Sequence, residues 1–443
     1  MKPAVSPELI SAFYDLFYPA PMRSLLIAFA AVAVAAVVVV SLSAQQAQPQ
    51  EEKTTEDKRF EVQVTDEMRR HSRIGDTLYF VGTAWSFGVL VLLLATGLSQ
   101  RMRDAAARVT KKPFLLAMLY IVLFILAVAV LEFPLTYYAG FMVPHQFDLT
   151  DQSFGSWIGD MLKGLAVNLV IGSVIGALAL LAIRRVRRWW VVLWAATVPL
   201  TVLVVVITPI VLDPIFNKFE PLQDQVLKQK LLDLASRAGI EGSRVYQVNK
   251  SKQTKTMNAY VTGIGPTNRI VMWDTLLMKM NHDEVLGVMG HEMGHYVMKH
   301  IWKTLAFLLA LSGLVFYVIG RLYEPGLSRW GSRWGVTGRG DPASLPWLLV
   351  IASAAAFLLS PVISGYSRAQ EHQADMFALE VTHLNEPFAT AFVQMAEDSK
   401  RDPSPHPFIK FWRYTHPPIA ERIPFALQYK PWEKGEPNQV WKP

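Results

Sequence analysis

The sequence predicts a mainly α-helical, polytopic membrane protein with seven transmembrane helices and a polar α+β domain. Three observations lead to this prediction. Hydrophobic residues make up 52% of the 443-residue chain and charged residues only 18%, whereas about 25% of a typical soluble protein is charged. The apolar residues are gathered into long runs. Seven of these runs approach the roughly 20 residues that a helix needs to cross a bilayer.

In chain order, the seven apolar runs are Leu25–Ala44, Thr77–Leu98, Phe114–Thr136, Met161–Ile183, Val191–Leu212, Thr304–Gly320 and Leu345–Ile363. The first run has an alternative interpretation. Arg23 precedes it and small residues follow it, a pattern that is also typical of a cleavable signal peptide. Whether this first segment is retained in the mature protein therefore stays open.

Polar stretches between the runs divide the chain into two regions. Residues 1–212 form an N-terminal membrane region with five transmembrane helices. Residues 213–443 form a second domain, which includes the two further transmembrane helices at about 304–320 and 345–363. The stretch Gln45–Ile74 is a polar loop of mixed charge that precedes the second span, and we expect it to be helical or partly mobile.

Composition excludes several classes of function. Cysteine is absent, so disulfides, thiolate metal sites and cysteine nucleophiles are excluded. The net charge of +7 does not indicate nucleic-acid binding, because many basic residues cluster beside apolar runs, where they meet lipid headgroups. We expect a lipid bilayer and no nucleic acid among the partners.

The polar stretch between the fifth and sixth spans contains both helix and strand patterns. Leucines at helical spacing predict an amphipathic helix over Asp224–Ala238. Short β-rich runs at Arg244–Asn249, Met257–Thr262 and Arg269–Trp273 follow, and the turn sequence between the last two predicts a hairpin. A helix from about His282 to His300 comes next, with Asn281 as its N-cap.

The segment His291-Glu292-Met293-Gly294-His295 carries the strongest chemical signal. Side chains four residues apart share one face of a helix, so both imidazoles can reach one metal ion. Glu292 lies beside that face, where it can take a proton from a water molecule. This spacing is typical of the zinc-protease helix. We therefore predict one Zn²⁺ per chain and no other cofactor.

A catalytic zinc with two histidine ligands needs a third protein ligand. The spacing offers Glu371 and Asp375, four residues apart on a helix after the seventh span. One carboxylate could bind the metal while the other orients a ligand imidazole. Surface ion pairs of both with Arg368 are the alternative, and spacing alone does not decide between the two.

Taken in order, these motifs resemble the type I CAAX prenyl protease family of integral-membrane zinc metalloproteases. The resemblance rests on the His291–His295 motif, on Ser367-Arg368 followed by Glu371 and Asp375, and on three weaker pieces: Asp213–Leu222, Asn258-Ala259-Tyr260 and His416-Pro417-Pro418. It covers essentially the whole chain. It implies seven helices that enclose a large intramembrane chamber capped by a zinc domain.

The resemblance also implies roles for individual residues. His291, His295 and Glu371 would bind zinc, Glu292 would be the general base, and Asp375 would be the outer partner of a ligand histidine. Asn258 and His416 would line the catalytic centre and hold the substrate or its tetrahedral intermediate. The implied reaction is hydrolysis of peptide bonds near the C-terminus of prenylated (CAAX-type) or other membrane-associated peptides.

Two alternatives to this function remain. One is a general quality-control protease of the membrane. The other is a membrane scaffold or transporter without catalysis, although a scaffold has no need of Glu292.

The orientation in the membrane is open as well. Fifteen Lys and Arg residues lie in the N-terminal tail and the even-numbered short loops, against six in the first and third loops, which would place the zinc domain outside the cytoplasm. The resemblance to eukaryotic members implies the opposite. The composition suggests a multi-pass protein of a bacterial inner membrane, or of the endoplasmic reticulum membrane if the source is eukaryotic. The oligomeric state cannot be inferred from the sequence.

Overall fold

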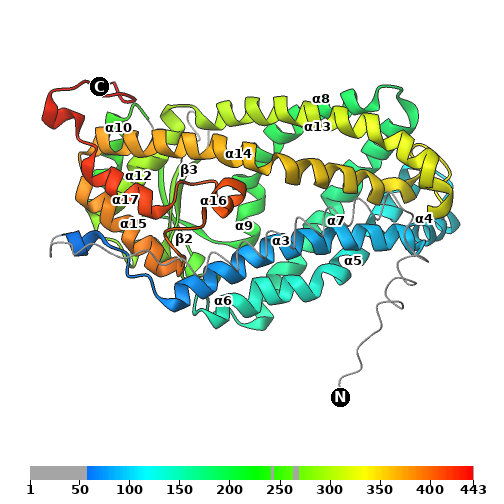
Figure 1. Cartoon of the computed structure of the whole chain (residues 1–443), viewed down its shortest axis with the longest axis horizontal. Coiled ribbons are helices and arrows are strands. Elements are labelled where there is room, and N and C mark those ends of the chain that lie inside the picture. The colour runs from blue at the N-terminus through cyan, green and yellow to red at the C-terminus, as the bar shows by residue number, and fades with distance from the viewer. Residues whose placement is uncertain (1–56, 241–243, 263–268, 443) are drawn as a thin grey trace, which may run out of the picture.

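The computed structural model describes residues 57–240, 244–262 and 269–442. Long apolar helices run along the longest dimension of the molecule, a small sheet with its helices lies at one end, and α4 lies at the other (Figure 1). The six long apolar helices are α3 (Asp66–Ala95), α5 (Pro113–Tyr137), α7 (Phe154–Arg185), α8 (Trp189–Ile207), α13 (His300–Trp330) and α14 (Leu345–Thr382).

Within the described residues, nine further α-helices connect or cover these elements. They are α4 (Leu98–Val109), α6 (Val143–Gln146), α9 (Asp213–Phe216), α10 (Gln225–Arg237), α11 (Asp274–Leu277), α12 (His282–Val297), α15 (Asn385–Ser399), α16 (Pro407–Arg413) and α17 (Ile419–Gln428). Single π-helical turns follow α5 and α8, at Tyr138–Met142 and Thr208–Leu212.

Five helical stretches of the described chain are long and apolar enough to cross a membrane, and α8 is a shorter apolar helix. These six helices coincide with the second to seventh predicted spans. The first predicted span, Leu25–Ala44, lies outside the described residues, so the count of seven stays a prediction. Side chains such as Val130, Val170 and Leu358 are 72%, 68% and 65% exposed. Apolar side chains in such positions are expected to face lipid rather than water.

The helix boundaries differ from the prediction at two places. Helix α3 begins at Asp66, eleven residues before the predicted span, because Thr65 caps a polar first turn that contains no apolar run. The predicted helix from His282 to His300 is interrupted at Lys299, whose φ is +57°. Helix α12 therefore ends at Val297, and His300 begins the membrane helix α13.

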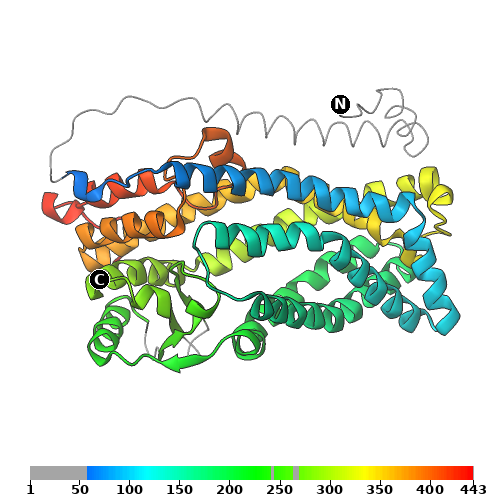
Figure 2. The same ribbon diagram turned by 90° about the horizontal axis from the view of Figure 1, so that it is seen from below.

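Four short strands form one sheet in the order β1-β2-β4-β3. They are β1 (Phe219–Pro221), β2 (Arg244–Val248), β3 (Ala259–Thr262) and β4 (Arg269–Trp273). β3 pairs antiparallel with β4, and Ala259 lies opposite Met272, as the predicted hairpin requires. The turn of this hairpin lies outside the described residues. β3 is thus an edge strand. Figure 2 shows, after a quarter turn, that the sheet and α4 still lie at opposite ends.

The core of the sheet domain lies between the sheet and helices α10, α12 and α14. The predicted amphipathic helix is α10, and it buries Leu227, Leu231 and Leu234. Helix α14 belongs to both parts of the molecule, since its 38 residues rise by about 57 Å at 1.5 Å per residue, well beyond the roughly 30 Å of a bilayer core. A membrane helix therefore also carries residues of the sheet domain.

Helix α12 packs closely against α14 and α15 through three glycines. A Cβ added at Gly287 would lie 3.2 Å from Phe388, one at Gly290 would lie 3.3 Å from the Ala378 backbone, and one at Gly294 would lie 3.0 Å from Phe377 Cβ. Because these glycines recur at intervals of three and four residues, they form one face of α12. That close approach brings the histidines of α12 near the carboxylates of α14.

Gly294→Ala is therefore expected to destabilise the protein, although alanine favours helix by about 1 kcal/mol. Phe377 is fully buried, and overpacking of this kind costs about 1–3 kcal/mol. The midpoint of thermal unfolding in detergent should fall. Gly88→Ala in α3 is the matched control, because nothing lies within 4 Å of its added Cβ. An unchanged midpoint for Gly294→Ala would contradict the close packing of α12.

Candidate active site

The N-terminus of α12 is fixed by a complete capping box, as the sequence predicts. The Asn281 side chain accepts hydrogen bonds from the backbone N–H groups of Asp283 and Glu284, and the Glu284 carboxylate accepts from Asn281 N. The box satisfies donors that the first helical turn would otherwise leave free. It sets the start of the helix, and thereby the face on which His291 and His295 lie.

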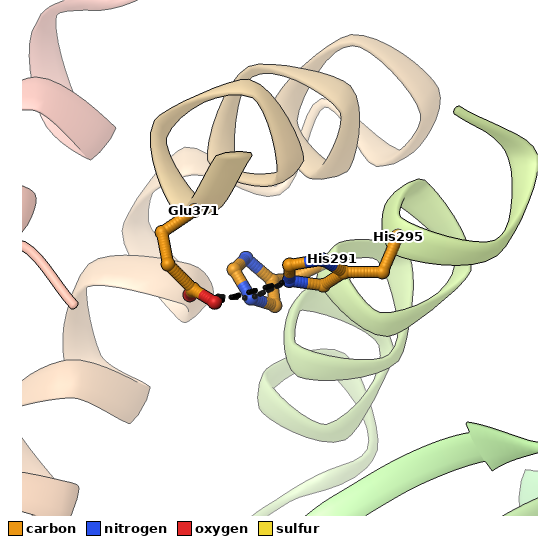
Figure 3. Close-up of side chains that lie close together, drawn as sticks. All are labelled: His291, His295 and Glu371. Carbon is orange, nitrogen blue, oxygen red and sulfur yellow. Dashed lines mark hydrogen bonds and ion pairs between the residues drawn. The ribbon is translucent and has the colours of Figure 1, made fainter. Parts of the chain in front are cut away.

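His291, His295 and Glu371 converge on one point between α12 and α14 (Figure 3). The Nε2 atoms of the two histidines lie 3.1 Å apart. Glu371 Oε2 lies 3.2 Å from His291 Nε2, and Glu371 Oε1 lies 3.4 Å from His295 Nε2. The three ligand atoms all lie within 4.8 Å of one another. Of the two carboxylates that the spacing offered, Glu371 is the one in this group.

The chemistry of this group fits a metal ion. His291 Nδ1 hydrogen-bonds Asp375 Oδ1 at 2.8 Å, so His291 Nε2 presents its lone pair to the Glu371 carboxylate. Glu371 Oε2 is buried, and no described residue donates a well-aligned hydrogen bond to it. Lone pairs and a carboxylate that converge in a buried place repel one another unless a cation lies between them. Two imidazoles and a carboxylate are ligands that zinc commonly takes.

The electrostatics of His291 point to the same need for positive charge. Burial alone would lower its pKa, but the hydrogen bond with Asp375 and the nearby Glu371 carboxylate outweigh burial and raise the pKa to about 9. In the absence of a metal, the site would therefore hold a proton on this imidazole at neutral pH. A metal ion that binds there replaces the proton.

Asp375 has a second partner that the sequence analysis missed. Arg422 of α17 forms a two-point contact with it, Nε to Oδ2 at 2.9 Å and Nη2 to Oδ1 at 2.5 Å. The Asp375 side chain is 1% exposed and that of Arg422 11% exposed, so the buried carboxylate is paired. Arg422 lies 47 residues from Asp375 in the sequence, and no motif connects the two.

His295 has a further partner in His300, the first residue of α13. His300 Nδ1 lies 3.0 Å from His295 Nδ1. Its other ring nitrogen contacts Gln373 of α14 at 3.1 Å. The helix break at Lys299, where φ is +57°, separates His300 from α12.

Glu292 lines a cavity of about 1130 Å³ together with His295. The cavity extends from these residues along the edge strand to apolar side chains of α8 and α13, which include Val202, Val205, Trp302, Leu305 and Leu308. Burial raises the pKa of the Glu292 carboxyl, an effect that the nearby His291 and His295 oppose. A carboxylate with a raised pKa, beside a metal group and open to a cavity, can accept a proton from water.

The remaining two predicted residues take different positions. His416 Nε2 lies 3.4 Å from Glu371 Oε1, so His416 belongs to the same group of side chains. Asn258 lies immediately before the edge strand β3, where its side-chain oxygen accepts a hydrogen bond from Ala259 N. Its carbonyl accepts one from Trp273 N. No described contact links Asn258 to the three metal-facing residues.

Comparisons with known proteins agree with this geometry. The family model described as peptidase family M48 matches residues 221–430. The model described as CAAX prenyl protease N-terminal, five membrane helices, matches residues 25–218. An uncharacterized metalloprotease of Bacillus subtilis, YhfN, is 34% identical over 358 residues, which are 81% of this chain and 84% of the relative.

A eukaryotic relative and a solved structure extend the comparison. CAAX prenyl protease 1 of Saccharomyces cerevisiae is 29% identical over 317 residues, which are 67% of this chain and 69% of the yeast protein. The crystal structure of S. mikatae Ste24p matches with a TM-score of 0.77 over 93% of this chain and 99% of that chain, at 22% identity. That structure shares the fold. The chain therefore belongs to peptidase family M48 and, within it, to the type I CAAX prenyl protease family of multi-pass membrane metalloendopeptidases.

Proposed function

We propose that the protein is a zinc endopeptidase that hydrolyses peptide bonds near the C-terminus of prenylated (CAAX-type) or other membrane-associated peptides. The observation that carries the proposal is the convergence of His291, His295 and Glu371 beside Glu292, on a cavity that reaches the apolar faces of α8 and α13. The chain belongs to a family of metalloendopeptidases, and the side chains that hydrolysis needs are all present in this site. Both facts argue against a scaffold without catalysis.

In this proposal His291, His295 and Glu371 are the zinc ligands. They would hold a zinc ion, which would supply a Lewis acid able to acidify a water molecule and polarise the scissile carbonyl. Glu292 accepts the proton of the attacking water and then passes it to the leaving amine. Asp375, held by Arg422, keeps the His291 ring turned so that Nε2 faces the metal position.

His416 and Asn258 would serve the substrate. His416 lies beside Glu371 and is chemically able to donate a hydrogen bond to the oxyanion as it forms. Asn258 precedes the edge strand β3, to which an extended peptide can add through its backbone.

We also propose the division of the chain into a membrane region at residues 1–212 and a metallopeptidase domain at residues 213–443, which includes α13 and α14. The proposed location is a bacterial inner membrane, or the endoplasmic reticulum membrane if the source is eukaryotic. The similarity to the Bacillus subtilis relative favours a second candidate, a general peptidase of membrane-associated peptides, since the relative is named only as a metalloprotease.

The test uses the detergent-purified protein and two matched peptides. One carries a farnesylated cysteine in a C-terminal CAAX box, and the other has the same sequence without the farnesyl group. Because the cavity wall on α8 and α13 is apolar, we expect the farnesylated peptide to be cleaved faster, by a factor of ten or more. Equal cleavage of both peptides would favour the general peptidase. If zinc-loaded protein cleaved neither, the assignment to CAAX-type substrates would be wrong.

A further inference from the structure

We infer that Arg368 is a positioning residue, which sets the place of His416 by holding the segment that carries it. This segment, residues 410–422, is called the strap below; it runs from the last turn of α16 through His416 into α17. The inference rests on the proposed function, because it concerns the histidine that would serve the substrate. It adds a role for a residue of α14 that lies one turn before Glu371.

Arg368 binds the strap at one end. Its Nη1 donates hydrogen bonds to two backbone carbonyls, Lys410 O at 2.9 Å and Tyr414 O at 2.6 Å. These carbonyls lie at the C-terminal end of α16, where Lys410 O also accepts a hydrogen bond from Tyr414 N and Tyr414 is the C-cap residue. A cation is favoured at this end of a helix. Arg368 makes this contact instead of the surface ion pairs with Glu371 and Asp375, which the sequence alone also allowed.

Arg422 binds the strap at its other end. It reaches from α17 to Asp375 of α14 through the two-point contact described above. Arg368 and Asp375 lie three residues before and four residues after Glu371, so a short stretch of α14 holds both attachments and a metal-facing carboxylate. His416 lies between the two attachments and 3.4 Å from that carboxylate.

The His416 side chain has little else to fix it. It is 58% exposed, and its described hydrogen bond is with the neighbouring Thr415 hydroxyl, at 2.9 Å. Pro417 and Pro418 follow it and restrict the backbone on one side. On the other side, the backbone is held at Tyr414 by Arg368, while Arg413 pairs with Asp76 of α3 and Trp412 O accepts a hydrogen bond from Ser360. Loss of Arg368 should therefore free the His416 side of the strap while leaving the contact between Arg422 and Asp375 in place.

The first measurement needs neither metal nor substrate. Hydrogen exchange of the metal-free protein, followed by mass spectrometry, should show faster exchange of residues 410–416 in Arg368→Ala than in the unmodified protein. Exchange in α12 should be unchanged. Arg339→Ala, which removes an exposed ion pair with Glu324, is the matched arginine control and should not alter the strap. Equal exchange of the strap in Arg368→Ala and the unmodified protein would overturn the inference.

The second measurement is a double-mutant cycle on the matched peptide that the unmodified protein cleaves faster. Removal of a hydrogen-bond donor to the oxyanion typically lowers kcat by a factor of about 10²–10³. Removal of a residue that orients a metal ligand typically lowers activity by a factor of about 10–100. We expect His416→Ala and Arg368→Ala to lower kcat within these ranges. The double variant should be no more than about threefold below His416→Ala, because Arg368 would then have nothing to position.

The outcomes separate the inference from the proposed function. If Arg368→Ala lowers kcat by the same factor with and without His416, its role is general stability and the inference is wrong. If His416→Ala leaves kcat unchanged, the inference also fails, yet cleavage that depends on Glu292 would still support the endopeptidase. Arg368→Lys guards against a misfolded alanine variant. It keeps the charge without the planar guanidinium, and it should give an intermediate kcat at full zinc content.

Discussion

Glu292→Gln is expected to abolish peptide hydrolysis while the fold and the bound metal are retained. The glutamine side chain has nearly the same shape as the carboxylate, so the walls of the cavity and the neighbouring histidines should keep their places. It cannot accept the proton of the attacking water, and removal of a general base typically costs about 10²–10⁴ in rate. The measurement is kcat on the matched peptides, together with zinc content per chain.

Glu284→Gln is the matched control for this substitution. Glu284 lies on the same helix and is buried, where it accepts hydrogen bonds from Asn281 N and from the Gln394 side chain. A glutamine at this capping-box position can still accept a hydrogen bond through its oxygen. Turnover should therefore stay within a few-fold of the unmodified protein. Retained hydrolysis by Glu292→Gln would show that another group takes the proton.

The membrane helices and the metal-binding helix were predictable because each leaves a local signal. A run of about 20 apolar residues is sufficient to identify a span, and His291 and His295 share a face through their spacing alone. The exact start of α3 left no such signal, because its first turns, from Asp66 to Asp76, are polar; the sequence predicted only that residues 45–74 are helical or partly mobile. The break before His300 depends on one residue, Lys299, in the left-handed region.

The partners of the site residues were predictable only in part, for a physical reason. Asp375 shares a helix face with Glu371, so its neighbourhood followed from the spacing. Arg422 reaches Asp375, and Arg368 reaches the α16 carbonyls, through tertiary packing that no local pattern encodes. The family resemblance placed His416 near the site, and the structure places it 3.4 Å from Glu371. The catalytic roles of these residues remain predictions until they are tested by substitution.

Glu371→Gln is expected to remove the metal ion from the purified protein. The substitution replaces a charged ligand by a neutral amide, a much weaker ligand for zinc. The affinity for zinc should therefore fall by more than about 10–100-fold, which is the typical loss when a residue that orients a metal ligand is removed. Asp375→Asn serves as the comparison, since it should weaken binding only within that smaller range. Zinc content after dialysis against a chelator of fixed affinity measures both.

Thermal unfolding distinguishes this explanation from simple misfolding. A ligand that binds the folded state stabilises it by about 2.7 kcal/mol at a concentration 100 times its Kd, so added zinc should raise the unfolding midpoint of the unmodified protein. That shift should vanish in Glu371→Gln. The metal-free variant should still unfold cooperatively, at a lower midpoint than the metal-free parent, because Glu371 is one of the two carboxylates that stabilise the proton on His291 when no metal is bound. Loss of the cooperative transition would instead show that the variant misfolds.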